Sequence, residues 1–497
     1  MVDINIREEK MKEARMATPF RDFIKEIASR LPIVFNRHNG LTSKYAPRSD
    51  RTGDIITSKQ HQEQRDDLRN RGKPYDFTMS FVDNLKMLFH EVPRANLRNE
   101  RSENCDYADV CLNSKNAYLS STVINGSENV LYSFSVKDHS LNVFNSVMVW
   151  NDSENVYFST GIIHSFNIFY SKFILNSSDV RFSTNLVGCH ECILCHDLEN
   201  ASYCIQNKNY SKEEYMQQKE ELLRQKTQFI TRYQSLAHAW NNFWSTRVEG
   251  NFLLECEDAT ESNLCYNVKN GRNLILVGSR GGTENAFDCF TWGSPTGLDF
   301  YGVMWAGNAQ KVFNSTGVDV SSNIYYSCNL VSCLFCLACN GLSNSQFCIL
   351  NKEYPKEERF VLADKIFAQM EKEGVLGKFF PWSLNPMYFN DTMASLIEDF
   401  SKEEIVWEGF LWRDEKIKID IPESVDVIST SALQNFQFFD AEGKRVINSQ
   451  VLNKVIKDTQ WDYYKIIPLE LSFLQKYWLP LPELHRLERI KLGFKFK

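Results

Sequence analysis

The sequence predicts a mainly β fold, in which two tandem parallel β-solenoids with helical caps are flanked by terminal regions of mixed α and β structure. Three observations predict it. A Ser-x-Asn pattern returns every 12 or 13 residues, it does so in two arrays whose ends are duplicated, and each array runs into a segment with helix-start signals. The 497 residues include 43% apolar ones, enough for a large core, which excludes a disordered protein.

The first array lies between residues 100 and 205. Its period of 12 or 13 residues is too short for a helical repeat, which needs about 30 residues or more. It suits one coil of short strands and turns. The Asn position of each Ser-x-Asn pattern is the anchor of the repeat. The position after each anchor is small and apolar, which predicts a column of inward side chains. A second column, of serines, is typical of turns. The anchors are Asn104, Asn116, Asn129, Asn142, Asn155, Asn167, Asp179 and Glu191.

The second array repeats the first. Residues 183–215 align without gaps to 327–359, at an offset of 144, and 17 of the 33 aligned positions are identical. We therefore expect a duplicated solenoid, whose second copy spans about 262–350 in coils of the same length.

Each array leads into a predicted capping helix. Ser211 and Glu214 have the spacing of a capping box. In the second copy, Pro355 stands where the first turn of a helix tolerates proline, and Gly374 is a stop signal. Helices placed there would cover the open ends of the solenoids.

These features divide the chain into four segments. We expect an N-terminal helical and irregular region (1–97), the first solenoid with its cap (98–228), the second solenoid with its cap (229–374), and a C-terminal α+β region with a basic tail (375–497).

Charge and composition limit the function. The 56 Lys and Arg against 63 Asp and Glu give a net charge of −7, which argues against a general nucleic-acid binder. No apolar run approaches the ~18 residues of a membrane span. The charged N-terminus lacks the apolar core of a signal peptide, so we expect a cytoplasmic protein, with a virion component as the alternative. In that compartment we expect the 14 cysteines to be reduced rather than paired in disulfides.

Several sequence blocks together resemble a repeat-protein family of candidate-phyla (ultra-small) bacteria. The resemblance covers most of the chain and implies the solenoid fold without implying an activity. Similar proteins carry zinc-ribbon cysteine pairs near both ends, but this chain has no cysteine before Cys105 or after Cys348. The matching blocks are PYDFTMSFVDNLKMLFHEVPRANL (74–97), the SENCDY and SKNAYLS coils, the twin Cys-x2-Cys-x2-Cys ends, FFPWSLNPMYFNDT (379–392) and KIIPLELSFLQKYWLPLPEL (465–484).

The sharpest chemical signal is a cysteine cluster at the end of each array. Four thiolates are what a structural Zn²⁺ site requires, so zinc is one interpretation. The other, which we prefer, is that these are core thiols, because each occupies an inward or turn position of the repeat. The clusters are Cys189, Cys192, Cys195 and Cys204, and Cys333, Cys336, Cys339 and Cys348. His190 beside the first cluster aligns with Leu334, which favours an exposed turn histidine.

The outward column next to the anchors is apolar and aromatic rather than acidic. Solenoid glycosidases and lyases need paired carboxylates on one outward face, so the pattern predicts no catalytic residue. An apolar stripe of this size indicates an interface, which protein should cover. Its predicted interface residues are Tyr118, Phe144, Tyr157 and Phe169.

These observations favour a non-enzymatic scaffold, a component of a larger cellular or viral assembly, with a protein partner or self-association and no membrane contact. The alternative is a zinc-containing, nucleic-acid-associated protein that binds through its basic termini. A carbohydrate-active solenoid enzyme is the third hypothesis, on fold analogy alone.

Overall fold

The computed structural model places most of the chain. It describes residues 4–36, 46–47, 54–224, 229–236, 242–243, 250–251, 253–254, 262–263, 268–275, 298–303, 306–307, 310–415, 421–458 and 462–494.

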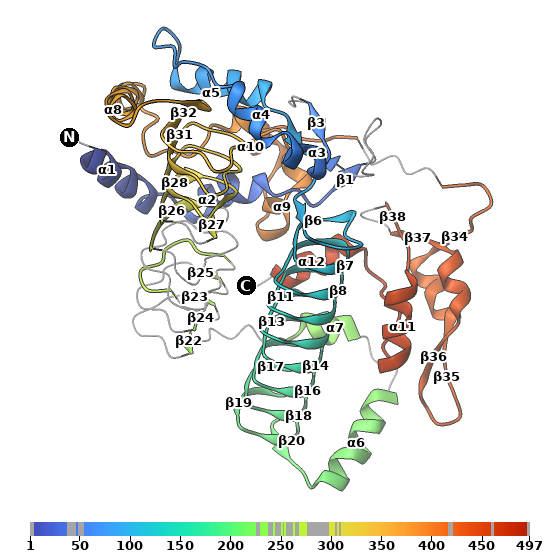
Figure 1. Ribbon diagram of the computed structural model, residues 1–497. Coiled ribbons are helices and arrows are strands. Elements are labelled where there is room, and N and C mark those ends of the chain that lie inside the picture. The colour runs from blue at the N-terminus through green and yellow to red at the C-terminus, as the bar shows by residue number, and fades with distance from the viewer. Residues whose placement is uncertain are drawn as a thin grey trace. The chain divides into compact units, whose positions relative to one another are not determined.

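The first solenoid is a stack of short parallel strands, drawn as a ladder of teal and green arrows in Figure 1. From β8 to β18, each strand pairs in parallel with the strand two places further on. Val143 of β10 is in register with Val156 of β12, which is in register with Ile168 of β14. One coil therefore holds two four-residue strands, and its length is the predicted 12 or 13 residues. The strands are β5 (Asn99–Glu100), β6 (Tyr107–Leu112), β7 (Lys115–Ile124), β8 (Glu128–Leu131), β9 (Phe134–Lys137), β10 (Leu141–Phe144), β11 (Val147–Trp150), β12 (Glu154–Tyr157), β13 (Thr160–Ile163), β14 (Phe166–Phe169), β15 (Lys172–Leu175), β16 (Ser178–Arg181), β17 (Thr184–Val187), β18 (His190–Ile193), β19 (His196–Glu199), β20 (Ser202–Ile205) and β21 (Lys208–Asn209).

Each coil bends at four places. One residue in three has a left-handed backbone, as the φ angles of Asn155 (57°), Phe158 (50°), Gly161 (70°) and His164 (46°) show within a single coil. Left-handed φ costs least for glycine and next for asparagine. The chain bends at the anchor with a left-handed backbone, which explains why the anchor is asparagine.

The anchors also bind one another. The amide Nδ2 of Asn142 donates to Oδ1 of Asn155 at 3.1 Å, and Nδ2 of Asn155 donates to Oδ1 of Asn167 at 3.1 Å. The same bond links the other anchors from Asn104 to Asp179. This asparagine ladder runs along the solenoid axis and reinforces the backbone bonds between coils.

The residue after each bend points inward. Val156 and Ile162 belong to one column of buried aliphatic side chains that fills the interior. Ser159 and Ser165 occupy the other inward corners, and Ser165 Oγ donates to the carbonyl of Ile163 at 2.8 Å. The same oxygen accepts the backbone N–H of Ser177 in the next coil at 3.1 Å. Serine is used here because its hydroxyl serves two coils at once.

The second array has the same architecture, and this confirms the duplicated solenoid. Val312, Ile324 and Cys336 are in parallel register, 12 residues apart. Part of the predicted start of this array, 276–297, lies outside the described residues. Strands of this array and its surroundings are β22 (Asn242–Phe243), β23 (Gly250–Asn251), β24 (Leu253–Leu254), β25 (Ser262–Asn263), β26 (Leu298–Val303), β27 (Ala306–Gly307), β28 (Gln310–Ser315), β29 (Val318–Asp319), β30 (Ser322–Tyr325), β31 (Leu334–Leu337), β32 (Cys348–Ile349) and β33 (Lys352–Glu353).

Both predicted capping helices form. Ser211 Oγ accepts the backbone N–H of Glu214 at 3.3 Å, and Ser211 N donates to Glu214 Oε2 at 3.1 Å, so the capping box is present. The second helix follows Pro355, and Gly374 takes a φ of 66° just after it ends. The helices of six or more residues are α1 (Ile4–Met16), α2 (Phe20–Ile27), α3 (Ser58–Glu63), α4 (Arg65–Asn70), α5 (Phe81–Glu91), α6 (Lys212–Arg224), α7 (Phe229–Gln234), α8 (Lys356–Lys372), α10 (Lys402–Trp407), α11 (Pro468–Tyr477) and α12 (Arg486–Phe494).

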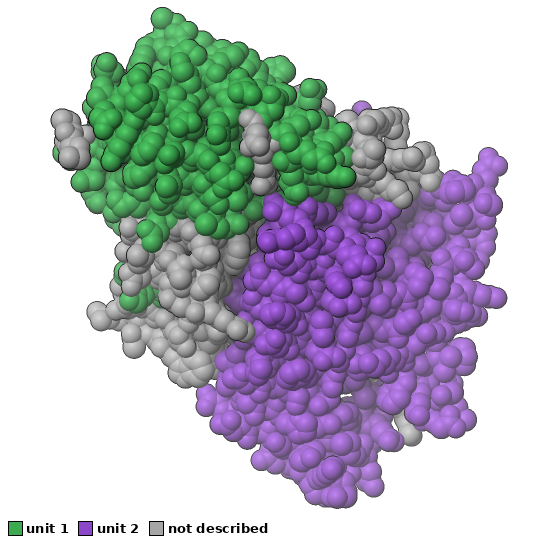
Figure 2. All heavy atoms as spheres, viewed as in Figure 1, with its two compact units in different colours: residues 1–98, 240–413 green, residues 99–239, 414–497 purple. Residues whose placement is uncertain are grey.

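The chain forms two compact units, coloured separately in Figure 2. Unit 1 is 1–98 with 240–413, and unit 2 is 99–239 with 414–497, so each unit joins one solenoid to one end of the chain. The C-terminal part of unit 2 adds β34 (Val427–Ser429), β35 (Gln437–Phe439), β36 (Arg445–Ile447), β37 (Val455–Asp458) and β38 (Asp462–Tyr464). Among the helices described above, none is long and apolar enough to cross a membrane.

Candidate functional site

The predicted interface residues form one column on the outside of the first solenoid. Phe144 is in register with Tyr157, and Tyr157 with Phe169, on successive coils. Tyr118 belongs to the same column, two coils earlier, through Leu131. Phe144, Tyr157 and Phe169 are almost fully buried, at 1%, 0% and 1% exposure, whereas Tyr118 is only partly buried.

The chain's own C-terminal region covers this column. The ring of Phe473 in α11 lies with its centroid 4.3 Å from that of Phe144 and 6.0 Å from that of Tyr157. Tyr477, one turn further along α11, lies 5.0 Å from Phe169. Aromatic contacts at these distances stabilise the packing beyond the area that they bury. The column is therefore part of the core of unit 2.

A second aromatic column, which the sequence analysis did not single out, lies beside the first. Phe158 and Tyr170 stack at 5.3 Å, and Tyr170 stacks on Phe182 at 5.4 Å. Helix α7 covers this column, because Tyr233 meets Phe158 edge-on at 5.1 Å and Phe229 meets Phe182 at 5.0 Å. The residues of this column occupy left-handed bends and recur every 12 residues, so the repeat itself contained the signal that could have found them.

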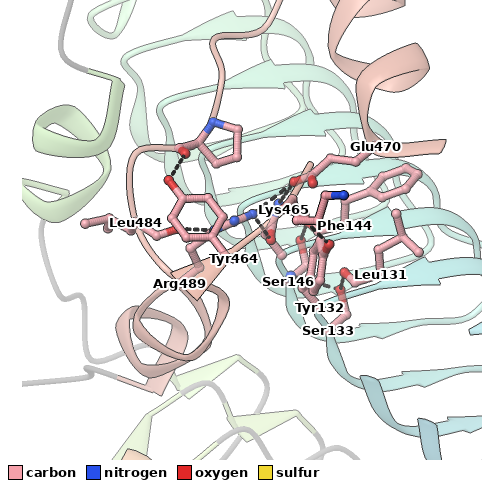
Figure 3. A network of polar contacts seen from close by, with 12 residues as sticks. Leu131, Tyr132, Ser133, Phe144, Ser146, Tyr464, Lys465, Glu470, Leu484 and Arg489 are labelled. Carbon is pink, nitrogen blue, oxygen red and sulfur yellow. Dashed lines mark hydrogen bonds and ion pairs between the residues drawn. The ribbon is translucent and has the colours of Figure 1, made fainter. Parts of the chain in front are cut away.

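A buried ion pair lies next to the first column (Figure 3). Arg489 of α12 donates from Nη1 to Oε1 of Glu470 in α11 at 2.9 Å and to Oδ1 of Asn145 on the solenoid at 2.7 Å. Glu470 and Arg489 are 0% and 1% exposed. Burial raises the pKa of Glu470, while the positive charge of Arg489 opposes that shift. The pair fixes α11 and α12 to one coil.

Two tyrosines complete this network, as Figure 3 shows. The guanidinium of Arg489 lies 5.3 Å from the ring centroid of Tyr132 and 5.5 Å from that of Tyr464. Tyr132 OH donates to the carbonyl of Lys465 at 3.3 Å, and Tyr464 OH donates to that of Pro482 at 2.7 Å. This network leaves no signal in the sequence, because its members are far apart in the chain and belong to different repeats or to none.

All eight cysteines of the two clusters are buried free thiols in the last coils of the two solenoids. Cys192 is in register with Val180 below it and with Cys204 above it, so both cysteines continue the aliphatic column. Cys189 takes a serine position, and its Sγ contacts the carbonyls of Val187 at 3.5 Å and Leu198 at 3.4 Å, as a serine hydroxyl would.

In each cluster, one thiol has its pKa raised by hydrogen bonds with its neighbouring thiols. Hydrogen bonds from Cys333, Cys339 and Cys348 raise the pKa of Cys336 far above its usual range. In the first cluster, Cys189 and Cys195 act on Cys192 in the same way. A tetrahedral metal site needs four sulfurs around a common centre. In the portion of the chain that the structure places, no group of three or more His, Cys, Asp or Glu side chains is arranged to hold a metal ion.

One exposed cluster has the residue types of a hydrolase triad. Ser178 Oγ lies 2.5 Å from Nδ1 of His190, and Asp179 Oδ2 lies 3.9 Å from that same nitrogen. A catalytic histidine binds the nucleophile with one ring nitrogen and the orienting carboxylate with the other. Because both neighbours share Nδ1 here, this cluster is not arranged to activate the serine.

Basic side chains of both termini pair with carboxylates of their own unit. Arg7 Nη1 lies 2.6 Å from Glu371 Oε2, and Lys25 Nζ lies 2.6 Å from Glu408 Oε1. In unit 2, Arg489 is the buried partner described above. These pairs reduce the positive charge that the termini can offer to phosphate groups.

The fold and the covered aromatic face define a β-solenoid repeat protein whose outward column is closed by its own terminal helices. Comparison of the chain with protein-family models, with curated proteins and with solved structures finds no match.

Proposed function

We propose that this protein is a non-enzymatic structural scaffold, a component of a larger cellular or viral assembly that it joins through a protein partner or a second copy of itself. The observation that carries the proposal is the closed aromatic column of unit 2. A solenoid enzyme uses an outward face as its substrate groove, whereas this face is filled by Phe473 and Tyr477 of α11.

The groups beside that column also favour a structural role. The carboxylate of Glu470 lies beside the column, is fully buried and is paired with Arg489. A general acid or base must reach its substrate, so this carboxylate is not placed for catalysis. Along the solenoid axis, the asparagine ladder links each coil to the next, which suits a rigid rod that holds other parts at fixed positions.

The test is an assay of the purified full chain on a panel of polysaccharides, with release of reducing ends as the readout. We expect no release. Release that is lost in Asp179→Asn or Asp197→Asn, two acids on the exposed side of the coils, would overturn the scaffold proposal and establish an enzyme. Lys444→Gln, far from the solenoid in sequence, is the matched control.

Assembly is tested separately by light scattering of the purified chain and by cross-linking in cells that produce it. The proposal requires a stable complex, either of several copies or with a defined protein at fixed stoichiometry. A chain that remains monomeric in both experiments and cross-links to no protein reproducibly would contradict it.

A further inference from the structure

The duplicated ends of the two solenoids differ in a reciprocal way. At the offset of 144 residues, Arg181 of β16 corresponds to Tyr325 of β30, and Tyr215 of α6 corresponds to Arg359 of α8. An arginine and a tyrosine have thus exchanged places between solenoid and cap. Their neighbours keep their character, as in the aligned pairs Phe169 and Phe313, Ile193 and Leu337, and Ile205 and Ile349.

In unit 2 the solenoid carries the cation and the cap carries the ring. The guanidinium of Arg181 lies 4.3 Å from the ring centroid of Phe169. Tyr215, in the first turn of α6, is 0% exposed and packs on Tyr203 at 5.7 Å. Burial lowers the pKa of Arg181 to about 10, and the nearby Tyr215 opposes that shift.

In unit 1 the arrangement is inverted. Arg359 is 1% exposed, and its guanidinium lies 5.8 Å from the ring centroid of Tyr325 on the solenoid and 5.2 Å from that of Phe360. Its Nε and Nη2 have no hydrogen-bond partner in this structure. Tyr325 is held in place, because its hydroxyl donates to Glu8 Oε1 at 2.5 Å. Arg359 therefore depends on the aromatic faces around it.

We propose that these reciprocal arginine–tyrosine pairs determine which helix caps which solenoid. The end surface of the first solenoid fits a helix that presents tyrosine, and the end surface of the second fits a helix that presents arginine. The inference is independent of the scaffold function, because it concerns how the chain selects its own contacts.

Mispairing would be unfavourable at both ends. Helix α8 on the first solenoid would bring Arg359 onto Arg181, and burying two like charges is costly. Helix α6 on the second solenoid would bring Tyr215 onto Tyr325, which removes the cation and adds a second buried hydroxyl beside that of Tyr325, which already donates to Glu8. Both helices begin with Lys-Glu-Glu, so the next position, 215 or 359, is the first residue that distinguishes them. The same rule would disfavour exchange of caps between two copies of the chain.

The test is a double-mutant cycle in the full chain, with Arg181→Tyr, Tyr215→Arg and the double variant, read as the melting temperature. Tyr215→Arg places two guanidiniums together and should lower the melting temperature by about 4 °C or more, and Arg181→Tyr should lower it less. The double variant recreates the arrangement of unit 1 and should recover most of the loss. Glu213→Arg, an exposed change of charge on the same helix turn, is the control and should not couple to position 181.

The mirror cycle in unit 1, with Tyr325→Arg, Arg359→Tyr and their combination, keeps the proposal testable if one variant of unit 2 does not fold. Recovery in either double variant supports the pairing rule. If the losses of the single variants simply add in every cycle that can be measured, the rule is wrong.

Discussion

At the scale of single residues, buried charges decide how the C-terminal region of unit 2 is held. Arg489 satisfies Glu470 and Asn145 at once, and its guanidinium lies against two tyrosine rings. Glu470 Oε2 has no hydrogen-bond partner in the structure, so the carboxylate relies on this arginine. Removing one partner of a buried pair leaves the other charge uncompensated, which costs more than removing both.

We therefore expect Arg489→Met to lower the free energy of unfolding by about 3–5 kcal/mol, and the double variant Arg489→Met/Glu470→Met to recover part of that loss. Urea denaturation of the full chain, followed by tryptophan fluorescence, measures both. The exposed pair Lys454–Asp426 is the control, and Lys454→Met should leave the midpoint unchanged within error. A double variant less stable than Arg489→Met would contradict this account.

His485 makes the stability depend on pH. Burial, with Arg486 and Arg489 nearby, lowers the pKa of this histidine from 6.5 to about 2. The folded chain keeps the ring neutral, while the unfolded chain binds a proton below pH 6.5, so stability falls as the pH falls. The contribution is about 1.4 kcal/mol per pH unit, or about 2 kcal/mol between pH 6.5 and pH 5.

His485→Gln should remove this part of the pH dependence, which urea denaturation at a series of pH values will show. The control is His139→Gln, because the side chain of His139 is exposed and its replacement changes no buried group. An unaltered slope in His485→Gln would mean that another group titrates in this range.

At the scale of the repeat, one coil is defined by its bends. Asn155 combines a φ of 57° with an amide that binds the anchors of both neighbouring coils. Its two roles can be separated by substitution. Glycine accepts the left-handed backbone without strain but cannot form the hydrogen bonds of the asparagine ladder, whereas alanine can do neither.

Asn155→Ala should therefore be less stable than Asn155→Gly by about 1 kcal/mol, and both should be less stable than the natural chain. Thermal and urea unfolding measure the difference. Equal losses of stability in the two variants would mean that Asn155 contributes through its hydrogen bonds in the asparagine ladder rather than through the backbone bend.

At the scale of the whole molecule, each solenoid is built into a separate unit with one end of the chain. The cysteine clusters finish both solenoids in the same way, which makes their metal content a property that should be shared. The register of Cys192, Cys204 and Cys336 with the aliphatic column favours a packed core of thiols.

Elemental analysis of protein prepared without added zinc should thus give close to zero zinc per chain, and Cys189→Ser, a return to the serine of the other coils, should fold normally. About two zinc ions per chain, lost in Cys192→Ser and Cys336→Ser, would overturn the core-thiol interpretation.

The period, the duplication and the capping signals are local properties of the chain, so the sequence alone determined the solenoids, their coil length and the start of both caps. The inward positions of the cysteines could also be read from the repeat. What covers Phe144 and Tyr157 could not, because Phe473 lies more than 300 residues further along the chain and belongs to no repeat. The tertiary structure decided that pairing, together with the Arg489–Glu470 contact, since non-local contacts depend on which surfaces meet and leave no periodic trace in the sequence.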